Sequence, residues 1–213
     1  MTKPDTQTET VAAPVHVPFD ETLRQAWARY GNAIYVVCAL IALGIIAKGT
    51  WDYLSAQREI GIEREYAACV SPDSFKAFAL SHPGHALTGL AELKVADDSF
   101  ATNHFDEART HYQNAVAILA DGPFRSHAQL GLAVSNAALG KSAEAEAGFK
   151  QLMNGTTQLK AIRCEAGFHL ASIAADAGRA AEVQTLAEQL LSIDPNSPFA
   201  ERAFSLRSEM AAK

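Results

Sequence analysis

Histidine is the residue type in this chain that most suggests metal chemistry. His82 and His85 flank a Pro-Gly dipeptide, and His104 and His111 follow farther along the chain. Imidazole nitrogens bind transition metals, but the recognised sites add cysteines or carboxylates at defined spacings, and none cluster with this segment. We therefore interpret the segment HPGH as the turn and cap that start a helix, and we expect no bound metal and no cofactor.

Paired carboxylates and nucleophile motifs are the other signatures of catalysis. Asp97 and Asp98 are adjacent. Successive side chains on a helix point about 100° apart, so these two do not form a catalytic pair, and we interpret them as a solvated edge. The sequence contains no phosphate-binding loop, no Gly-x-Ser-x-Gly turn and no dinucleotide-binding glycine pattern. We therefore predict a protein that is not an enzyme.

The three cysteines offer little redox chemistry. Cys38 lies inside the longest apolar stretch and is interpreted as a packing residue, whereas Cys69 and Cys164 fall on predicted soluble helices. If the soluble region is exported these two could form a disulfide, but only with their Cα atoms within about 7 Å of each other. Since they lie near opposite ends of that region, we interpret them as small buried side chains.

The amino-acid composition limits the classes of protein to which this chain can belong. The 213 residues include 18 Lys plus Arg and 24 Asp plus Glu, which gives a formal net charge of -6. Proteins that bind nucleic acids usually carry a basic field, so we predict no nucleic-acid partner. Hydrophobic residues make up 48% of the chain, so it is not broadly disordered. The length suits one domain of about 150 residues with an appendage.

A long uncharged stretch near the N-terminus supplies this appendage. The 18 residues between Arg29 and Lys48 carry no charge. As a helix they would cover about 27 Å, close to the roughly 30 Å of a bilayer core. We predict a transmembrane helix over residues 30–51, after a polar tail and pre-membrane segment over residues 1–29, of which the first 19 are expected to be disordered. Aromatic residues flank the span where interfacial belts occur: Trp27 and Tyr30, then Trp51 and Tyr53.

Two other interpretations of this stretch stay open. A cleaved signal peptide has fewer residues before its apolar run and ends at a small-x-small site, which is not evident here. A buried core helix seldom shows so many uncharged residues between aromatics. Orientation is also open, because the positive-inside rule gives a tie between Arg24 and Arg29 on one side and Lys48 and Arg58 on the other.

The remaining residues predict an all-α domain. Ala, Leu, Glu and Gln dominate, apolar residues recur at three- and four-residue steps, and no strand-like alternation is evident. We expect a connecting helix and N-terminal cap over residues 52–83, and a helical repeat domain over residues 84–213. The predicted helices, bounded by Pro and Gly signals, are 52–69, 72–81, 84–102, 105–120, 124–139, 142–153, 158–177, 179–192 and 197–210.

An internal repeat runs through this domain. Segments that start at Asn103, Gly140 and Gly178 align at spacings of 37 and 38 residues. Each starts with a residue that tolerates the left-handed conformation in which helices often end. Aligned positions carry small residues where two helices would approach closely, and mostly larger ones toward the next pair. They are Ala96, Ala133 and Ala171; Ala108, Ala145 and Val183; Tyr112, Phe149 and Ala187; and Ala115, Leu152 and Leu190.

This pattern resembles the tetratricopeptide repeat, in which two helices pair within about 34 residues. The family's eighth position, twentieth position and terminal proline are matched by Ala96, Ala133 and Ala171, by Ala108 and Ala145, and by Pro195. Val183 departs from the pattern, and no Trp occurs early in any repeat. The resemblance covers about residues 84–196 and implies an α-solenoid of about three helix pairs with capping helices. A non-repeating helical bundle is the alternative.

The resemblance also implies a binding groove, because the first helices of such pairs line a concave surface that binds polypeptides. The corresponding positions here are Leu93, Asp97, Phe100, His127, Leu130, Val134, Glu165, Phe168, Ser172 and Asp176. This set is apolar with acidic members and includes no Lys or Arg. It therefore lacks the basic cluster with which some members of the family bind a C-terminal carboxylate. The alternative is that Leu93, Leu130 and Phe168 are simply core.

The order of parts is similar to that of a bacterial group, the single-span ancillary subunits of the Sec translocon. The segment FALSHPGHALTGLAELKVAD, from Phe78, adds to this similarity. It implies a protein of the bacterial inner membrane, anchored in the lipid bilayer through residues 30–51, with a periplasmic repeat domain that associates with the Sec translocon and periplasmic chaperones. The alternatives are a scaffold for assembling cell-envelope or membrane complexes, and a self-associating structural protein with a packing face around Gly44.

Overall fold

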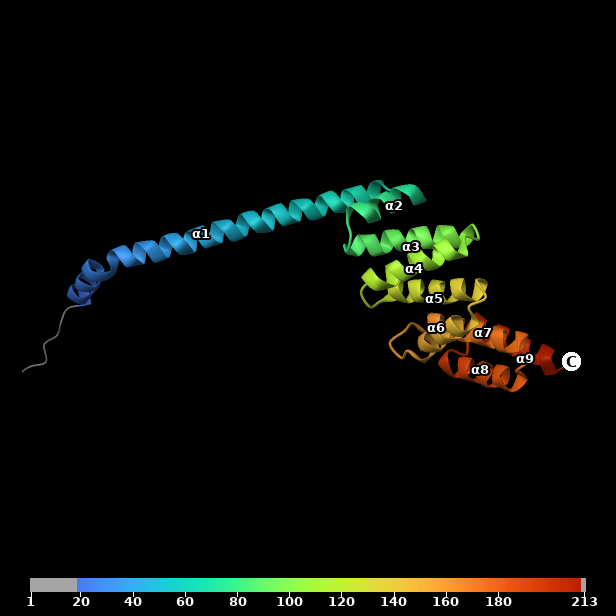
Figure 1. The fold of residues 1–213 in the computed structure, drawn as a ribbon. Coiled ribbons are helices and arrows are strands. Elements are labelled where there is room, and N and C mark those ends of the chain that lie inside the picture. The colour runs from blue at the N-terminus through green and yellow to red at the C-terminus, as the bar shows by residue number, and fades with distance from the viewer. Residues whose placement is uncertain (1–18, 212–213) are drawn as a thin grey trace, which may run out of the picture. The chain divides into compact units, whose positions relative to one another are not determined.

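The computed structural model describes residues 19–211, and these residues form nine helices and no strand. The predicted all-α class is confirmed. The predicted helix 52–69 is the continuation of α1, and the predicted helices from residue 72 onward agree with the observed bounds to within two residues. The first 18 residues of the predicted tail lie outside the described range, whereas Phe19 already begins α1. The helices are α1 (Phe19–Ala68), α2 (Pro72–Ser81), α3 (Ala86–Ala101), α4 (Phe105–Ile118), α5 (Pro123–Ala138), α6 (Ser142–Asn154), α7 (Lys160–Asp176), α8 (Ala180–Ile193) and α9 (Pro198–Ala211) (Figure 1).

The described chain divides into two compact units, one that ends at Arg58 and one that begins at Glu59. In the first unit, α1 carries the apolar stretch, and from Trp27 to Ala68 it is long and apolar enough to cross a membrane. None of the most apolar part of this helix is buried, so the interpretation as a core helix is wrong. Within residues 30–51, the large aliphatic side chains that stay more than half exposed are Val36, Val37, Leu40, Ile41, Leu43, Ile45 and Ile46.

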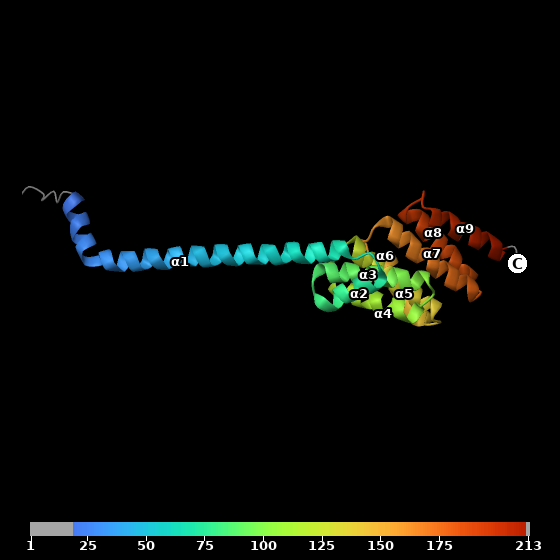
Figure 2. The same ribbon diagram turned by 90° about the horizontal axis from the view of Figure 1, so that it is seen from above.

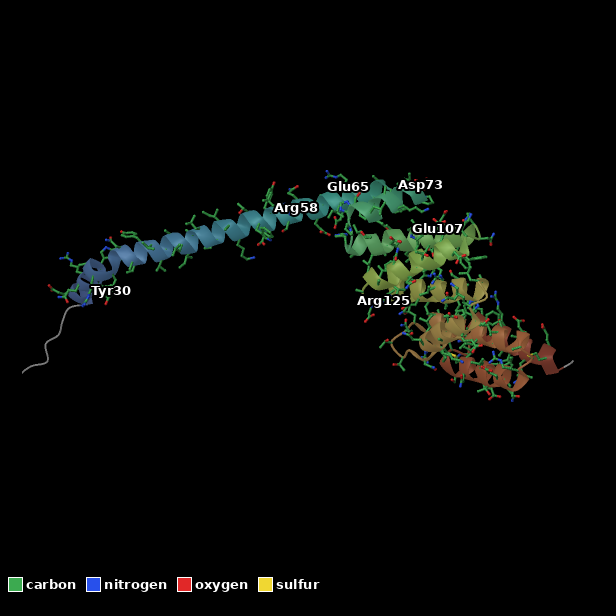
Figure 3. All side chains as sticks on the ribbon, viewed as in Figure 1. Tyr30, Arg58, Glu65, Asp73, Glu107 and Arg125 are labelled. Atoms are coloured by element: carbon green, nitrogen blue, oxygen red, sulfur yellow. The ribbon has the colours of Figure 1, made fainter. Side chains whose placement is uncertain are left out.

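The second unit is a stack of helix pairs. The pairs α3/α4, α5/α6 and α7/α8 follow one another in order, and the first helices of the pairs also pack side by side (Figures 1 and 2). Glu107, in the first turn of α4, and Arg125, in the first turn of α5, lie at opposite edges of the stack, as antiparallel neighbours require (Figure 3). Helix α2 packs on α3, and α9 packs on α7 and α8. The predicted solenoid of three pairs with capping helices is confirmed.

Each pair is joined by the same tight turn. Asn103, Gly140 and Gly178 have φ angles of 62°, 72° and 71°, the left-handed conformation that the sequence alignment predicted for them. The next residue then donates its backbone N–H to a carbonyl five residues back, which closes the end of the helix as a Schellman motif does. The N···O distances are 2.8 Å for His104 to Ser99, 2.9 Å for Lys141 to Asn136 and 2.8 Å for Arg179 to Ala174.

Small residues set the spacing within the pairs. The twelve aligned repeat residues are all buried. Val183, which stands where the other two repeats have alanine, is fully buried. Between α5 and α6, a Cβ added to Gly148 would lie only 3.0 Å from the Cβ of Ala133. The helices are therefore already in contact at this point. Large side chains such as Phe149, which is fully buried, fill the space toward the next pair.

Substitutions at the glycine turns and at the asparagine turn should change the free energy of unfolding in opposite directions. An L-residue with a Cβ pays roughly 1–2 kcal/mol in the left-handed conformation, so Gly140→Ala and Gly178→Ala should each lower the free energy of unfolding by about 1 kcal/mol. Asn103→Gly should relieve this cost and raise stability by a few tenths of a kcal/mol up to about 1 kcal/mol. The measurement is urea unfolding of the detergent-solubilised chain, followed by helical circular dichroism. Equal effects of all three substitutions would contradict the assignment of these turns.

Candidate protein-binding groove

The first helices of the pairs present two adjoining hollows on one face of the repeat unit. The acidic hollow has a volume of about 330 Å³ and is lined by Asp97, Phe100, Tyr112, His127, Leu130, Gly131, Val134, Glu165 and His169. The apolar hollow has a volume of about 570 Å³ and is lined by Tyr66, Leu90, Leu93, Lys94, Asp97, Pro123, Phe124, His127, Leu159 and Ile162. Asp97 and His127 belong to both, so the two hollows form one groove, which we call the concave groove.

Most of the predicted groove residues line these hollows. They recur at three- and four-residue steps on α3, α5 and α7, which puts them on one face of each helix. The residues that line a hollow are Leu93, Asp97, Phe100, His127, Leu130, Val134 and Glu165. Leu93 and Leu130 are nevertheless only 6% and 5% exposed, so they serve as the floor of the groove and as part of the core.

Three predicted residues near the C-terminal half of α7 line neither hollow. Phe168 packs against Phe199 of α9, with ring centroids 6.0 Å apart. Ser172 donates its hydroxyl to the carbonyl of Phe168, one turn earlier in the same helix, and Asp176 is exposed in the last turn of α7. The repeat pattern gives these positions to the groove, but α9 packs against α7 and occupies the space beside Phe168.

Asp97 is the polar centre of the groove. Its Oδ1 accepts a hydrogen bond from the Tyr112 hydroxyl at 2.7 Å and lies 3.1 Å from Nε2 of His127. Tyr112 is 3% exposed, and a Cβ on Gly131 would lie 2.3 Å from its ring. Glycine at position 131 therefore lets the tyrosine ring of α4 lie against α5 and reach the carboxylate on α3. The sequence identified Tyr112 only as a packing residue.

These contacts fix the charges at the centre. Burial raises the pKa of Asp97, but the hydrogen bonds from His127 and Tyr112 outweigh burial, so the pKa lies below its ordinary value. The hydrogen bond to Asp97 raises the pKa of His127 despite its partial burial. Burial, together with Asp97, raises the pKa of Tyr112, which keeps the hydroxyl a donor. Asp97 is thus ionised near neutral pH, and His127 is charged over a wider pH range than a free histidine.

The opposite wall of the acidic hollow comes from α7. Burial raises the pKa of Glu165, and the nearby His127 opposes this only in part. Among the described residues none donates a hydrogen bond to the Glu165 carboxylate. His169 stacks on Phe149 with ring centroids 4.9 Å apart, and burial lowers the pKa of this imidazole, so it is neutral near pH 7.

A family model described as a tetratricopeptide repeat-like domain matches residues 24–161, more than half of the chain. The chain belongs to this family. The comparisons with curated proteins and with solved structures gave no match. The matched segment begins before the apolar stretch of α1 and ends at the start of α7, so it covers the apolar helix and the first two helix pairs of this tetratricopeptide repeat-like protein.

The HPGH segment of the tetratricopeptide repeat-like domain performs the capping that the sequence predicted. Nδ1 of His85 accepts the backbone N–H of Leu87 at 3.2 Å, which caps α3. Nε2 of His85 lies 2.9 Å from Glu59, and Nε2 of His82 lies 2.7 Å from Glu65, which Figure 3 labels near the end of α1. Across the part of the chain that the structure describes, no three metal-ligating side chains come together.

The cysteines of the tetratricopeptide repeat-like protein form no disulfide within the described chain. Cys38 is exposed on α1, Cys69 is partly buried and Cys164 is fully buried on α7, and all three are free. The interpretation of Cys164 as a small core side chain agrees with this placement, whereas Cys69 is less buried than expected.

The sequence predicted only three residues of the apolar hollow, Leu93, Asp97 and His127. Leu90 precedes Leu93 by three residues, and Phe124 precedes His127 by three, so helical periodicity could have added both to the predicted groove. Tyr66 and Leu159 come from the end of α1 and from the residue just before α7. Their place depends on how these segments pack, and no local pattern signals it.

The two histidines that line the acidic hollow, His127 and His169, should titrate on opposite sides of the ordinary pKa of about 6.5. His127 should have the higher pKa, and Asp97→Asn should lower it because the charged partner is lost. His169 should have the lower pKa and should not respond to Asp97→Asn. The measurement is a pH titration of the imidazole NMR signals, assigned with His127→Asn and His169→Gln. A wild-type His127 that titrates below His169 would contradict the proposed pairing.

The contact between Asp97 and His127 also determines how the stability of the protein should depend on pH. Because the pKa of His127 is raised, its contribution is fully present below about pH 6.5 and is lost as the pH rises through the folded-state pKa. Because the pKa of Asp97 is lowered, its contribution is present above about pH 4 and is lost as the pH falls through the folded-state pKa. Both side chains are about half exposed, so the stability difference between wild type and His127→Asn should stay below about 1 kcal/mol and should shrink above pH 7.

Proposed function

We propose that this tetratricopeptide repeat-like protein is a non-enzymatic, membrane-anchored scaffold that binds polypeptides in its concave groove. One observation carries the proposal. A single helix, α1, contains the exposed apolar stretch and also supplies Tyr66 to the groove. Helix α1 therefore carries the proposed anchor and also contributes one residue to the groove, and the family model matches the apolar stretch together with the first two helix pairs.

The membrane part of the proposal rests on the cost of exposed apolar side chains. Each Leu, Ile or Val that leaves water contributes roughly 1.5–3 kcal/mol, and α1 leaves a run of them exposed within residues 30–51. Lys48, near the end of the proposed span, pairs with Asp52 at 2.9 Å, which partly neutralises its charge where the helix would meet the interface. Residues 1–29 would then lie on one side of the membrane and residues 52–213 on the other.

The binding part of the proposal rests on surface chemistry. Phe124 and Leu159 are 60% and 55% exposed at the rim of the apolar hollow, whereas most other large apolar side chains of the repeat unit are buried or half-buried. Exposed apolar side chains beside an apolar hollow favour contact with an apolar group of a partner. An anchor on the same chain as such a groove raises the effective concentration of partners that reside at the membrane.

In its most specific form, the proposal is an accessory factor at the Sec translocon. The protein would lie in the bacterial inner membrane with its repeat domain in the periplasm, and it would pass exported chains to periplasmic chaperones. The order of tail, span, connecting helix and repeat domain supports this version. The alternatives are a scaffold for cell-envelope or membrane-complex assembly and a self-associating structural protein, and the identity of the crosslinked proteins distinguishes them.

The anchor is tested by extraction. Full-length protein in membrane vesicles should remain in the pellet after washing with high salt and with alkaline carbonate. Leu40→Arg combined with Leu43→Arg adds two charges that each cost about 2.5–3.5 kcal/mol at the centre of a span, so this variant should move largely to the supernatant. Thr110→Arg on α4 serves as the control and should stay in the pellet. Extraction of the wild-type chain by carbonate would refute the anchor.

The partner is tested by site-specific photocrosslinking in intact cells. A photoreactive amino acid at Phe124 faces the apolar hollow, and the same amino acid at Thr110 on the exposed side of α4 is the matched control. We expect adducts with translocon subunits or chains in transit from position 124 at several times the yield from position 110. Adducts with assembly factors alone would favour the envelope scaffold, adducts with the protein itself would favour self-association, and equal yields would refute the groove.

A further inference from the structure

We propose that the acidic hollow selects a lysine or arginine side chain of the bound polypeptide, and that His127 competes with this cation for Asp97, so that binding releases a proton. This inference rests on the proposed function, because it specifies the chemistry of the polypeptide that the concave groove binds. It concerns the acidic hollow, whose carboxylates have no role in the apolar contacts proposed for the rim of the other hollow.

The charges of the acidic hollow favour a cation. Two carboxylates, Asp97 and Glu165, face it from α3 and α7, and its lining includes no Lys or Arg. Both hydrogen bonds to Asp97 fall on Oδ1, and no described residue donates to Oδ2. Glu165 is partly buried and has no donor among the described residues. A partly buried carboxylate without a donor is costly, and a bound ammonium or guanidinium group would supply the missing hydrogen bonds.

The walls of the hollow suit the rest of such a side chain. Phe100 offers a half-buried aromatic ring, and Leu130 and Val134 offer aliphatic surface between the two carboxylates. Lysine and arginine have long aliphatic stems that pack on apolar surface while the charged head reaches a polar group. A cation near an aromatic face gains further attraction. The volume of about 330 Å³ is ample for one such side chain.

The neighbouring apolar hollow extends the description of the partner. It shares Asp97 and His127 with the acidic hollow, and Phe124 and Leu159 stand exposed at its rim. One segment of polypeptide can therefore fill both, with a large apolar residue in one hollow and a lysine or arginine in the other. The preferred segment carries these two residue types a few positions apart.

His127 occupies the place of this cation in the unbound protein. It is half exposed, so its ring can rotate into solvent and release Asp97. The titratable groups that face it are Lys94 and Asp97 on α3, Tyr112 on α4, Glu165 and His169 on α7, and Tyr66 on α1. The carboxylates favour its charged form, the exposed Lys94 disfavours it, and α6, on another side of α5, contributes no residue to either hollow. A bound cation would therefore expel the proton, and affinity should rise as His127 deprotonates.

The test uses the full-length chain in lipid nanodiscs and a phage-displayed library of random dodecapeptides, selected at pH 7.5. We expect enriched peptides that combine Lys or Arg with Leu, Ile or Phe within a few positions. Asp97→Asn combined with Glu165→Gln should weaken a selected peptide about five- to twentyfold, as for two solvent-accessible ion pairs. The matched control is Asp98→Asn with Glu188→Gln, which removes two exposed carboxylates outside the hollows and should change affinity less than twofold.

Proton linkage is the second readout. Affinity of wild type for the selected peptide should fall about threefold to tenfold from pH 7.5 to pH 6, since one proton must leave on binding. His127→Asn should bind more tightly than wild type at pH 6 and should lose most of this dependence. Selected peptides without basic residues, or a pH profile identical in His127→Asn, would overturn the inference while the groove stands. Failure to select any peptide would overturn both this inference and the binding part of the proposed function.

Discussion

The close approach of paired helices at small residues is the constraint on which the rest of the repeat unit depends. Ala133 and Gly148 leave no room for another methyl group between α5 and α6, and alanines at equivalent places in the other pairs are fully buried. Because the two helices of each pair are in such close contact, large side chains such as Phe149 can point away from the partner helix and fill the space between pairs. The first helices then lie side by side, and their shared face becomes the concave groove.

Most of the fold could be predicted from the sequence because its signals are local. Proline at the first helical position, glycine or asparagine at the turns, and alanine at a regular spacing each act within a few residues. The turn at Asn103 was recognised from the same signal as the two glycine turns. From residue 72 onward the predicted helical bounds were accurate to within two residues for this reason.

The parts of the groove that could not be predicted depend on contacts distant in sequence. The hydrogen bond from Tyr112 to Asp97 requires that Gly131, on a third helix, leave space for the ring. Phe168 was assigned to the groove because the repeat places it there, yet α9 packs against it. Tyr66 lines the groove only because the end of α1 joins the repeat unit. None of these contacts has a counterpart in the spacing of residues along the chain.

The capping helix α9 is held to the repeat unit through its aromatic side chains. It packs on α7 and α8, and Phe199 lies beside Phe168 of α7. Arg202 and Arg207 place their guanidinium groups over the rings of Phe199 and Phe204, at 5.7 and 4.3 Å from the ring centroids. Both rings also pack against the core of the repeat unit, so each joins an apolar contact with that core to an attraction with a cation on its own helix.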